Sequence, residues 1–288
     1  MIIASYNIQY GTGKDGEIDL ARIAGELGDA DIIALQEVER FFSTTGMVDQ
    51  AAAIAELFPK HFWTFGPGVD LDASRVDADG RVENRRRQFG NMLLSRWPIL
   101  SSRNHLLPKF GMVEQLALQR SILEGVIETA ALGPVRVHSV HLGHAAAPER
   151  RNQIGQLNRI LREAPGQGGV VTGRSASKHW TADGPLVDMP RQAVFLGDFN
   201  LTPDDPEYDL LVGPIDPKYG RISRLDGLVD AWLACGNDPD GGATCGSGNG
   251  PVRIDYAFLT PDLADTAKSM WVDADAQGSD HQPIFVEF

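Results

Sequence analysis

Short apolar runs, each closed by a turn signal or a polar residue, follow one another along most of the chain. The apolar and β-branched residues 1–8 predict a first strand, and "DIIALQEV" predicts a second, buried strand that ends at Gln36 and Glu37. Residues 19–28 begin with a capping Asp and end with Gly28, which indicates a helix. A second helix is expected over residues 49–58.

The rest of the chain mixes hairpin-like pairs with strands that a helix connects. Strands are expected at "HFWTFG", "FGNMLLSRWPIL", "RSILEGVIETA", "VRVHSVHLG", "AVFLGDFN", "RIDYAFLT", "KSMWVDA" and "HQPIFVEF". Helices are expected over residues 148–163, where apolar positions recur at helical spacing, and near 205–211. Because strands outnumber helices, this order predicts an α/β sandwich built on mixed sheets.

Two stretches, residues 67–88 and 165–191, are expected to be long loops, and loops of this length usually border functional sites or are disordered. In the second, Arg174, Lys178, His179 and Trp180 are candidates for choosing a substrate. Neither stretch carries the compositional change of a domain boundary. We therefore expect residues 1–288 to form a single catalytic domain.

The formal net charge of the 288-residue chain is −13, which argues against a general nucleic-acid coat protein. Residues 81–120 depart from this average, because they hold eight Lys or Arg residues and only two acidic residues. A local positive patch on an acidic protein suits a small anionic ligand better than a long polyanion. The plainer interpretation of the Arg85–Arg87 run is a solvated loop face.

The two cysteines, Cys235 and Cys245, are too few for a disulfide scaffold and lack the spacing of a zinc site. No apolar run approaches the roughly 20 residues that cross a bilayer, and the start of the chain lacks the features of a signal peptide. A cytoplasmic location is therefore expected. The sequence indicates no oligomeric state.

Polar and ionisable side chains stand where the predicted strands end. Five or six strands each deliver one: Asn7, Glu37, His141, Asp198 with Asn200, Asp255, and Asp280 with His281. If these ends converge, the crowded carboxylates repel one another and raise one another's pKa values. A hard divalent cation removes that penalty, and oxygen ligands suit Mg²⁺, Mn²⁺ or Ca²⁺ better than zinc.

Seven stretches in this order, "SYNIQYG", "ALQEV", "FGNMLLSRWPI", "VHSVHLG", "FLGDFN", "RIDYAFL" and "SDHQPIFVEF", resemble the motif series of the endonuclease/exonuclease/phosphatase superfamily. The resemblance spans residues 5–288 and is specific for the superfamily but not for a substrate. It implies a four-layer α/β sandwich, two packed mixed β-sheets flanked by helices, with the site at one edge. It also implies hydrolysis of a phosphate ester with a divalent metal, usually Mg²⁺.

The resemblance also implies the metal and phosphate ligands. Glu37 resembles the principal metal ligand, with Asn7 and Asp280 beside it. Asn91 and Arg120 match weaker positions on flanking strands, where phosphate contacts are expected.

The catalytic roles are carried over in the same way. Asp198 resembles the residue that positions or deprotonates the attacking water, and Asn200 resembles the partner that orients the phosphate or that water. His281 resembles an imidazole on the phosphoryl oxygens, and Asp255 resembles the carboxylate that holds it. His141 resembles a second imidazole near the leaving or non-bridging oxygen.

Plainer roles compete at several positions. Asp255 can be a buried carboxylate whose hydrogen bonds are all made within the core, and Arg120 can be an arginine at the edge of the core. His138, His141 and His144 are spaced by three residues, but on a strand 138 and 141 face opposite sides, which disfavours zinc.

Three functions stay open at this stage. The first is hydrolysis of a small or lipid-derived phosphodiester or phosphomonoester. The second is a nuclease on the same core, which the net charge disfavours. The third is a catalytically silent binding protein, which is disfavoured because no motif position is lost. The aromatic residues Tyr6, Trp63 and Phe89 are expected in the core rather than as stacking platforms for bases.

Overall fold

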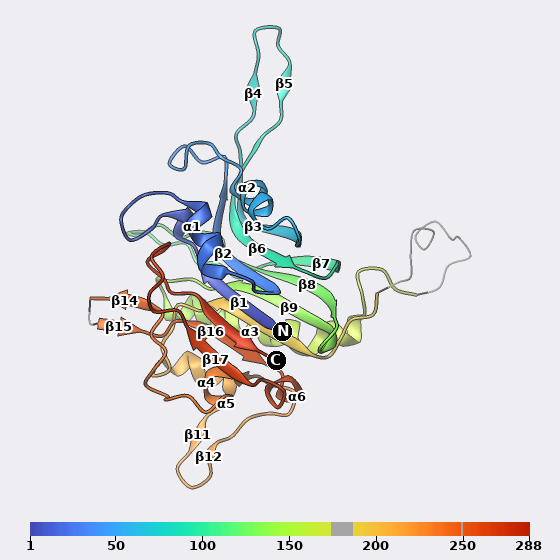
Figure 1. Cartoon of the computed structure of the whole chain (residues 1–288), viewed down its shortest axis with the longest axis vertical. Coiled ribbons are helices and arrows are strands. Elements are labelled where there is room, and N and C mark those ends of the chain that lie inside the picture. Colours follow the sequence, from blue (N-terminus) through green and yellow to red (C-terminus); the bar gives the residue numbers. More distant parts are fainter. Residues whose placement is uncertain (174–186, 249) are drawn as a thin grey trace.

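Two packed β-sheets form the centre of the protein (Figure 1). The structure is a computed structural model that describes residues 1–173, 187–248 and 250–288. The first sheet has the strand order β17 (Ser269–Val272), β18 (Ile284–Glu287), β1 (Ile2–Asn7), β2 (Ile32–Arg40), β6 (Arg86–Ser95) and β3 (Phe62–Asp72). The second has the order β13 (Val229–Asp230), β16 (Asp255–Leu259), β10 (Ala193–Asp198), β9 (Gly133–His141), β8 (Ser121–Thr129) and β7 (Ile99–Leu106).

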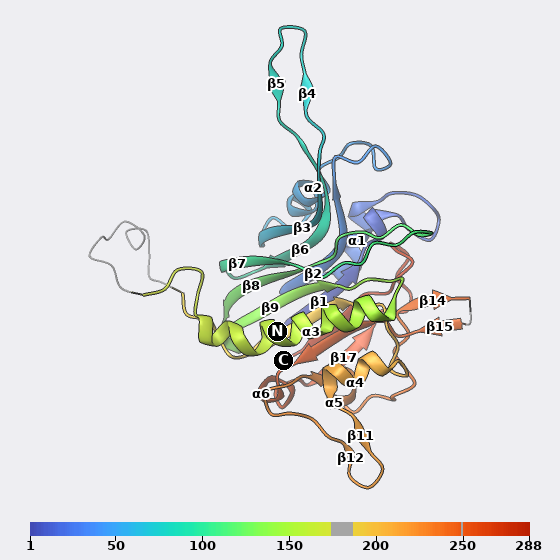
Figure 2. The same cartoon turned by 180° about the vertical axis from the view of Figure 1, so that it is seen from behind.

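Helices α1 (Leu20–Leu27) and α2 (Gln50–Leu57) cover the outer face of the first sheet, and α3 (Ala147–Gln167) and α4 (Pro206–Val212) cover that of the second. The shorter α5 (Ala231–Ala234) and α6 (Pro261–Ala264) contribute Ala231 and Leu263 to the core between the sheets, and the short helix η1 (Gln9–Gly11) follows β1. Figure 2 shows α3 lying along the back of the second sheet. Helix α1 connects the parallel pair β1–β2, and α3 connects the parallel pair β9–β10, while most other neighbours are antiparallel.

The alternation of side chains along the strands builds the four layers. Ile3, Ile32 and Val194 point into the core between the sheets, where they pack together. Their neighbours point the other way: Ile33 packs in the core of α1 and α2, and Phe195 packs in the core of α3 and α4. The structure therefore confirms the predicted four-layer α/β sandwich.

A buried polar link joins the two sheets close to the edge where the strands end. The Gln36 side-chain amide donates to Ser139 Oγ at 2.9 Å, and Ser139 Oγ donates to the carbonyl oxygen of Leu35 at 2.9 Å. Both side chains are fully buried, so neither hydrogen bond competes with water. The link fixes the sheets relative to each other at the place where both deliver polar side chains.

The expectation of a loop over residues 67–88 is wrong. Strand β3 runs on to Asp72 and pairs with β6 as far as Asp72↔Arg86, and the hairpin of β4 (Arg75–Val76) and β5 (Val82–Glu83) continues the ribbon away from the body (Figure 1). A register shift between Pro67 and Val69 lets the strand pass the proline. Two further hairpins, β11 (Ile215–Asp216) with β12 (Gly220–Arg221) and β14 (Cys245–Ser247) with β15 (Gly250–Val252), lie outside the two sheets.

Other boundaries also differ from expectation. The stretch "FGNMLLSRWPIL" is two strands, β6 and β7, that belong to different sheets. Helix α3 extends to Gln167, so the second expected loop begins later than residue 165. Trp63 is 44% exposed rather than in the core, because β3 is the edge strand of its sheet. The candidates Arg174, Lys178, His179 and Trp180 lie outside the described residues.

Candidate active site

A cleft of about 210 Å³ opens where the polar ends of the strands meet. The register explains the convergence, because Asp198 at the end of β10 lies opposite both His141, the last residue of β9, and Asp255, the first residue of β16. Asn7 reaches the same place from the end of β1 in the other sheet. The cleft is lined by Tyr10, Glu37, Phe89, Leu118, Arg120, His141, His144, Asp198, Asn200 and His281.

Asp198 lies at the centre of the hydrogen bonds in this cleft. Its Oδ2 accepts a hydrogen bond from Asn7 Nδ2 at 3.0 Å, and its Oδ1 accepts one from the backbone N–H of Asn200 at 2.9 Å. Burial, and secondly the nearby Asp255 carboxylate, raise the pKa of Asp198 to about 7. A carboxylate with this pKa can take up a proton near neutral pH.

A glycine lets the strand beside Asp198 approach its neighbour. Gly197 has φ of 144°, and a Cβ there would overlap the carbonyl oxygen of Val140 on β9. Only glycine therefore fits in the "LGD" sequence just before the catalytic candidate.

His281 is held by Asp255 through a short buried contact. Its Nδ1 lies 2.8 Å from Asp255 Oδ2, and the two side chains are 9% and 2% exposed. Burial alone would lower the pKa of His281, but the charge and hydrogen bond of Asp255 outweigh it and raise that pKa well above its usual range. The ring is therefore an imidazolium, whose Nε2 lies 3.9 Å from Asp198 Oδ2.

Arg120 determines the state of the second imidazole. Its Nη1 lies 3.0 Å from His141 Nδ1, and its Nη2 lies 3.3 Å from His144 Nδ1. Because a guanidinium group only donates, the Nδ1 atoms of His141 and His144 both accept. We therefore assign the proton of the His141 ring to its other nitrogen, Nε2. That nitrogen lies 3.4 Å from Asp198 Oδ2. Burial first, and then the Arg120 charge, hold the pKa of His141 well below its usual value, so the ring is neutral.

Glu37 reaches the cleft through a break in its strand. The strand does not end at Glu37, as expected, but continues to Arg40 past a register shift between Leu35 and Val38. Glu37 itself has φ of 60°, an uncommon conformation for a residue other than glycine. Burial raises the pKa of its carboxyl group, while the Arg120 and His281 charges and a hydrogen bond from Asn7 oppose that rise.

Strained backbone is concentrated around this cleft. Gln9, Tyr10 and Asn200 have positive φ values of 43°, 51° and 51°, and each lies in or beside the site. Such conformations cost of order 1–3 kcal/mol each and persist where the surrounding structure holds them. The strain is consistent with side chains aimed for chemistry rather than for packing.

Four of the sequence-predicted residues are not part of the cleft lining: Asn7 and Asp255, which contact Asp198 and His281 from behind, and Asn91 and Asp280. Asn91 lies buried between the sheets, and its amide donates to the carbonyl oxygens of Ser121 and Ser139 at 2.8 and 3.1 Å. Asp280 lies on the outer side, where its Oδ2 accepts from Gln9 Nε2 at 3.0 Å. Asp280 is still close enough for its charge to raise the pKa of Glu37.

The cleft also contains residues that the sequence reasoning missed as site residues: Tyr10, Phe89, Leu118 and His144. His144 was considered only as part of a zinc series. The first member of that series, His138, instead stacks on Phe195 in the core and contacts Glu124 at 3.2 Å. Tyr10 and Leu118 lie in connecting segments, where no periodicity marks a functional side chain.

The donor set beside Glu37 suits a hard cation. Within residues 1–173, 187–248 and 250–288, no three His, Cys, Asp or Glu side chains form a metal site on their own. The Glu37 and Asp280 carboxylates nevertheless offer oxygen ligands, and a cation would offset the raised pKa of Glu37. Asn7 can add its carboxamide oxygen, which here accepts a hydrogen bond from the Gln9 N–H at 3.2 Å while its NH2 faces Asp198 and Glu37. Mg²⁺ usually binds through one or two carboxylates and keeps several waters, so these residues fit it.

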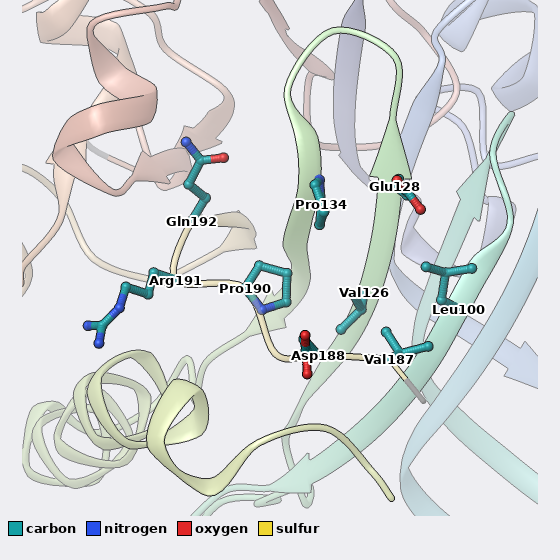
Figure 3. Close-up of a pocket in the computed structure, with 9 residues that line it drawn as sticks. All are labelled: Leu100, Val126, Glu128, Pro134, Val187, Asp188, Pro190, Arg191 and Gln192. Atoms are coloured by element: carbon teal, nitrogen blue, oxygen red, sulfur yellow. The ribbon is translucent and has the colours of Figure 1, made fainter. Parts of the chain in front are cut away.

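A larger cavity, of about 700 Å³, lies at the other end of the second sheet (Figure 3). It is bordered by Val126 and Glu128 near the end of β8 and by Pro134 at the start of β9, whereas His141 ends β9. Its sides are mostly apolar, and it contains none of the candidate residues. Volume alone therefore does not mark the candidate site, and the converging polar groups favour the smaller cleft.

The family model of the endonuclease/exonuclease/phosphatase family matches residues 4–281. The chain belongs to this family. Among curated proteins, none matches the sequence. Of the helices in the described part of the chain, none has both the length and the apolar character needed to cross a membrane.

Solved structures share the fold at low sequence identity. An endonuclease/exonuclease/phosphatase from Beutenbergia cavernae is 24% identical with a TM-score of 0.66, over 99% of this chain and 70% of that one. A mannosyl-6-phosphatase of Bacteroides thetaiotaomicron is 18% identical with a TM-score of 0.62, over 100% and 98%. The 3′ phosphatase NExo from Neisseria, bound to a product DNA hairpin, is 18% identical with a TM-score of 0.57, over 100% and 99%.

Proposed function

We propose that the protein hydrolyses a phosphate ester with the help of a divalent cation, Mg²⁺ in the first place and Mn²⁺ or Ca²⁺ as alternatives. The observation that carries the proposal is the meeting of Asp198, Asn7 and the His281–Asp255 pair at one edge of both sheets. Family membership supports the same reaction class. The proposed catalytic domain is the whole of residues 1–288.

Glu37 is the proposed main ligand of the cation, with Asn7 and Asp280 beside it. The bound cation would supply positive charge to the phosphate oxygens and thereby stabilise the charge that develops in the transition state. Burial of Glu37 supports this role, because an ionised buried carboxylate needs a positive partner.

Asp198 is the proposed base for the attacking water. In the reaction the water oxygen forms a bond to phosphorus, its proton passes to Asp198, and the bond between phosphorus and the leaving oxygen breaks. Asn200 would orient the water or the phosphate, since its backbone already fixes Asp198 Oδ1. A pKa of about 7 matches the task of accepting a proton near neutral pH.

The cationic groups of the cleft would bind the phosphoryl oxygens. His281 is an imidazolium held by Asp255, and Arg120 supplies a planar guanidinium that suits phosphate geometry. His141 would act as a neutral donor through Nε2 toward the leaving or a non-bridging oxygen. Asn91 has no direct part in this proposal, because its amide is engaged between the sheets.

A small ester is the favoured substrate, whether sugar-like, lipid-derived or nucleotide-like. The cleft of about 210 Å³ and the net charge of −13 both suit a small anionic group. A nuclease is the second candidate, and the likeness to the DNA-bound 3′ phosphatase supports keeping it. A silent binding protein is least supported, since the candidate catalytic groups are all present. A cytoplasmic location stays a prediction.

A panel of esters assayed with Mg²⁺ tests the proposal. The panel contains a phosphomonoester, a phosphodiester and a short single-stranded and duplex DNA, each with wild type and with Asp198→Asn. We expect turnover of at least one small ester that the variant loses by at least about 10²-fold. Absence of any Asp198-dependent hydrolysis across the panel would refute the proposal, and turnover of DNA alone would select the nuclease.

A further inference from the structure

A row of side chains on β6 leads from between the sheets, past the cleft and outward. Asn91, Phe89 and Arg87 are two residues apart and therefore share one face of the strand. Asn91 contacts the second sheet, and the Phe89 ring lies 6.3 Å from the His141 ring with the Arg120 guanidinium 5.8 Å from its centre. Arg87 is the next residue of this row, about 7 Å further out at the rise of an antiparallel strand.

The residues between them face the other way. Gln88 accepts a hydrogen bond from Arg40 Nη1 at 2.9 Å, and Arg86 forms an ion pair with Asp70 at 2.8 Å. Arg86 is thus already neutralised on the far face of the ribbon. Of the two adjacent arginines on this strand, Arg87 alone continues the row that passes the cleft.

Arg87 has no polar partner in the described part of the chain. Its guanidinium makes no hydrogen bond or ion pair there, and its Nε is buried without an acceptor. Its guanidinium carbon lies 5.8 Å from the centre of the Phe42 ring, in a cation–π contact. The neighbouring Arg40 and Arg85 differ, because each is paired with a carboxylate, Asp49 and Glu83.

The Nε of Arg87 is a buried donor without an acceptor, and a buried donor that loses its water partner costs free energy. Arginine also presents its donors as a planar fork that matches the oxygens of a phosphate or a carboxylate. An anionic group bound here would satisfy those donors, while the Phe42 ring would support the chain or ring that carries the group.

We propose that Arg87 and Phe42 form an outer subsite that binds a second anionic group, a phosphate or a carboxylate, of the ester whose reacting phosphate lies in the cleft. This inference rests on the proposed function and narrows it to substrates with two anionic groups. Because Arg87 lies one strand repeat, about 7 Å, beyond Phe89, which lines the cleft, the second anionic group would lie further out than the reacting phosphate, and the preferred chain length of the substrate measures their separation. The subsite selects substrate and takes no part in bond breaking.

The test compares esters that differ only in a second phosphate. Ethanediol, propanediol, butanediol and hexanediol bisphosphates are assayed for kcat/KM against the matching alkyl monophosphates, with Mg²⁺ and wild-type protein. For one chain length, we expect kcat/KM of the bisphosphate to exceed that of the matching monophosphate by about 10-fold or more. The comparison is corrected for the fact that a bisphosphate has two ends that can react. Arg87→Met should remove this preference and leave kcat/KM for the monophosphate unchanged. Arg87→Lys should keep part of it.

Arg86→Met is the matched control, since it removes the same charge from the opposite face and should keep the preference. Binding of butanediol bisphosphate by isothermal titration calorimetry, in the absence of turnover, separates the two proposals. Weaker binding by Arg87→Met than by Arg86→Met supports the subsite even if no ester is hydrolysed. Equal binding by the two variants, or a bisphosphate preference that survives in Arg87→Met, would overturn it. Thermal unfolding of each variant checks that it is folded.

Discussion

Replacing Asp198 with asparagine should make the protein more stable while it destroys activity, and the gain should depend on pH. Folding raises the pKa of this carboxyl group from its ordinary value of 3.8 to about 7. A raised acid pKa means that folding favours the protonated form. The contribution of the protonated Asp198 carboxyl group to the free energy of unfolding is therefore complete below about pH 4. It is lost progressively as the pH rises to about 7.

The size of the effect follows from the same two pKa values. A rise from 3.8 to about 7 corresponds to on the order of 4 kcal/mol between the two protonation states. Of this, on the order of 2–3 kcal/mol is lost by the wild type between about pH 5 and pH 8. The asparagine side chain keeps one oxygen, which accepts from the Asn200 N–H. Its NH2 group would face the NH2 group of Asn7, so two donors would meet, and this offsets part of the gain in stability.

The assay is urea unfolding of wild type and Asp198→Asn, in chelator, at pH 5 and pH 8. We expect the stability difference between variant and wild type to grow in favour of the variant by about 1–3 kcal/mol from the lower to the higher pH. Asp226→Asn is the control: Asp226 is 54% exposed and should change by no more than about 0.5 kcal/mol. A difference that is the same at both pH values would refute the reasoning about Asp198.

The other predictions concern the remaining groups of the site and the core. Glu37→Gln should lower Mg²⁺-dependent turnover by at least about 10²-fold and weaken Mn²⁺ binding measured by electron paramagnetic resonance, with unchanged circular dichroism. Asp255→Asn should lower kcat by about 10²- to 10⁴-fold, because His281 loses the carboxylate that keeps it charged, and an unchanged rate would exclude the pair from catalysis. Arg136→Met should destabilise the protein by about 3–5 kcal/mol in urea unfolding, since its fully buried guanidinium donates to the carbonyl oxygens of Pro190, Ile160 and Leu161.

The order of the strands and most of the polar groups at their ends could be predicted from the sequence. Short continuous apolar runs mark buried strands, and a polar residue directly after such a run stands out, as Asp198 does after "VFLG". Parallel neighbours then bring such ends together, as the registers Asn7↔Gln36 and Asp198↔His141 illustrate.

What the sequence could not predict depends on local geometry without periodicity. Glu37 lies at a bulge inside its strand, and nothing in "ALQEVER" distinguishes a bulge from a strand end. The ribbon of residues 67–88 contains proline, glycine and several aspartates, which are typical of loops, and its pairing with β6 is a tertiary choice. Tyr10 enters the cleft from a left-handed backbone conformation that its residue type does not favour.

Asn91 shows the opposite limit of sequence reasoning. On β6 it lies one two-residue repeat further in than Phe89, which lines the cleft, and its amide donates to carbonyl oxygens of the second sheet. A motif match predicts on which face of its strand a residue lies and in which order the matched residues follow along the chain. The depth at which a side chain meets the other sheet comes only from packing.

The most direct test of the account is the rate of hydrolysis of a simple phosphate ester, measured with Mg²⁺ and again after removal of the cation by chelator. We predict turnover with Mg²⁺ that falls to the background of Glu37→Gln in chelator and returns when Mg²⁺ is restored. Equal rates with and without the cation, or full activity of Glu37→Gln with Mg²⁺, would contradict the central claim that oxygen ligands at this edge of the sheets hold a catalytic cation.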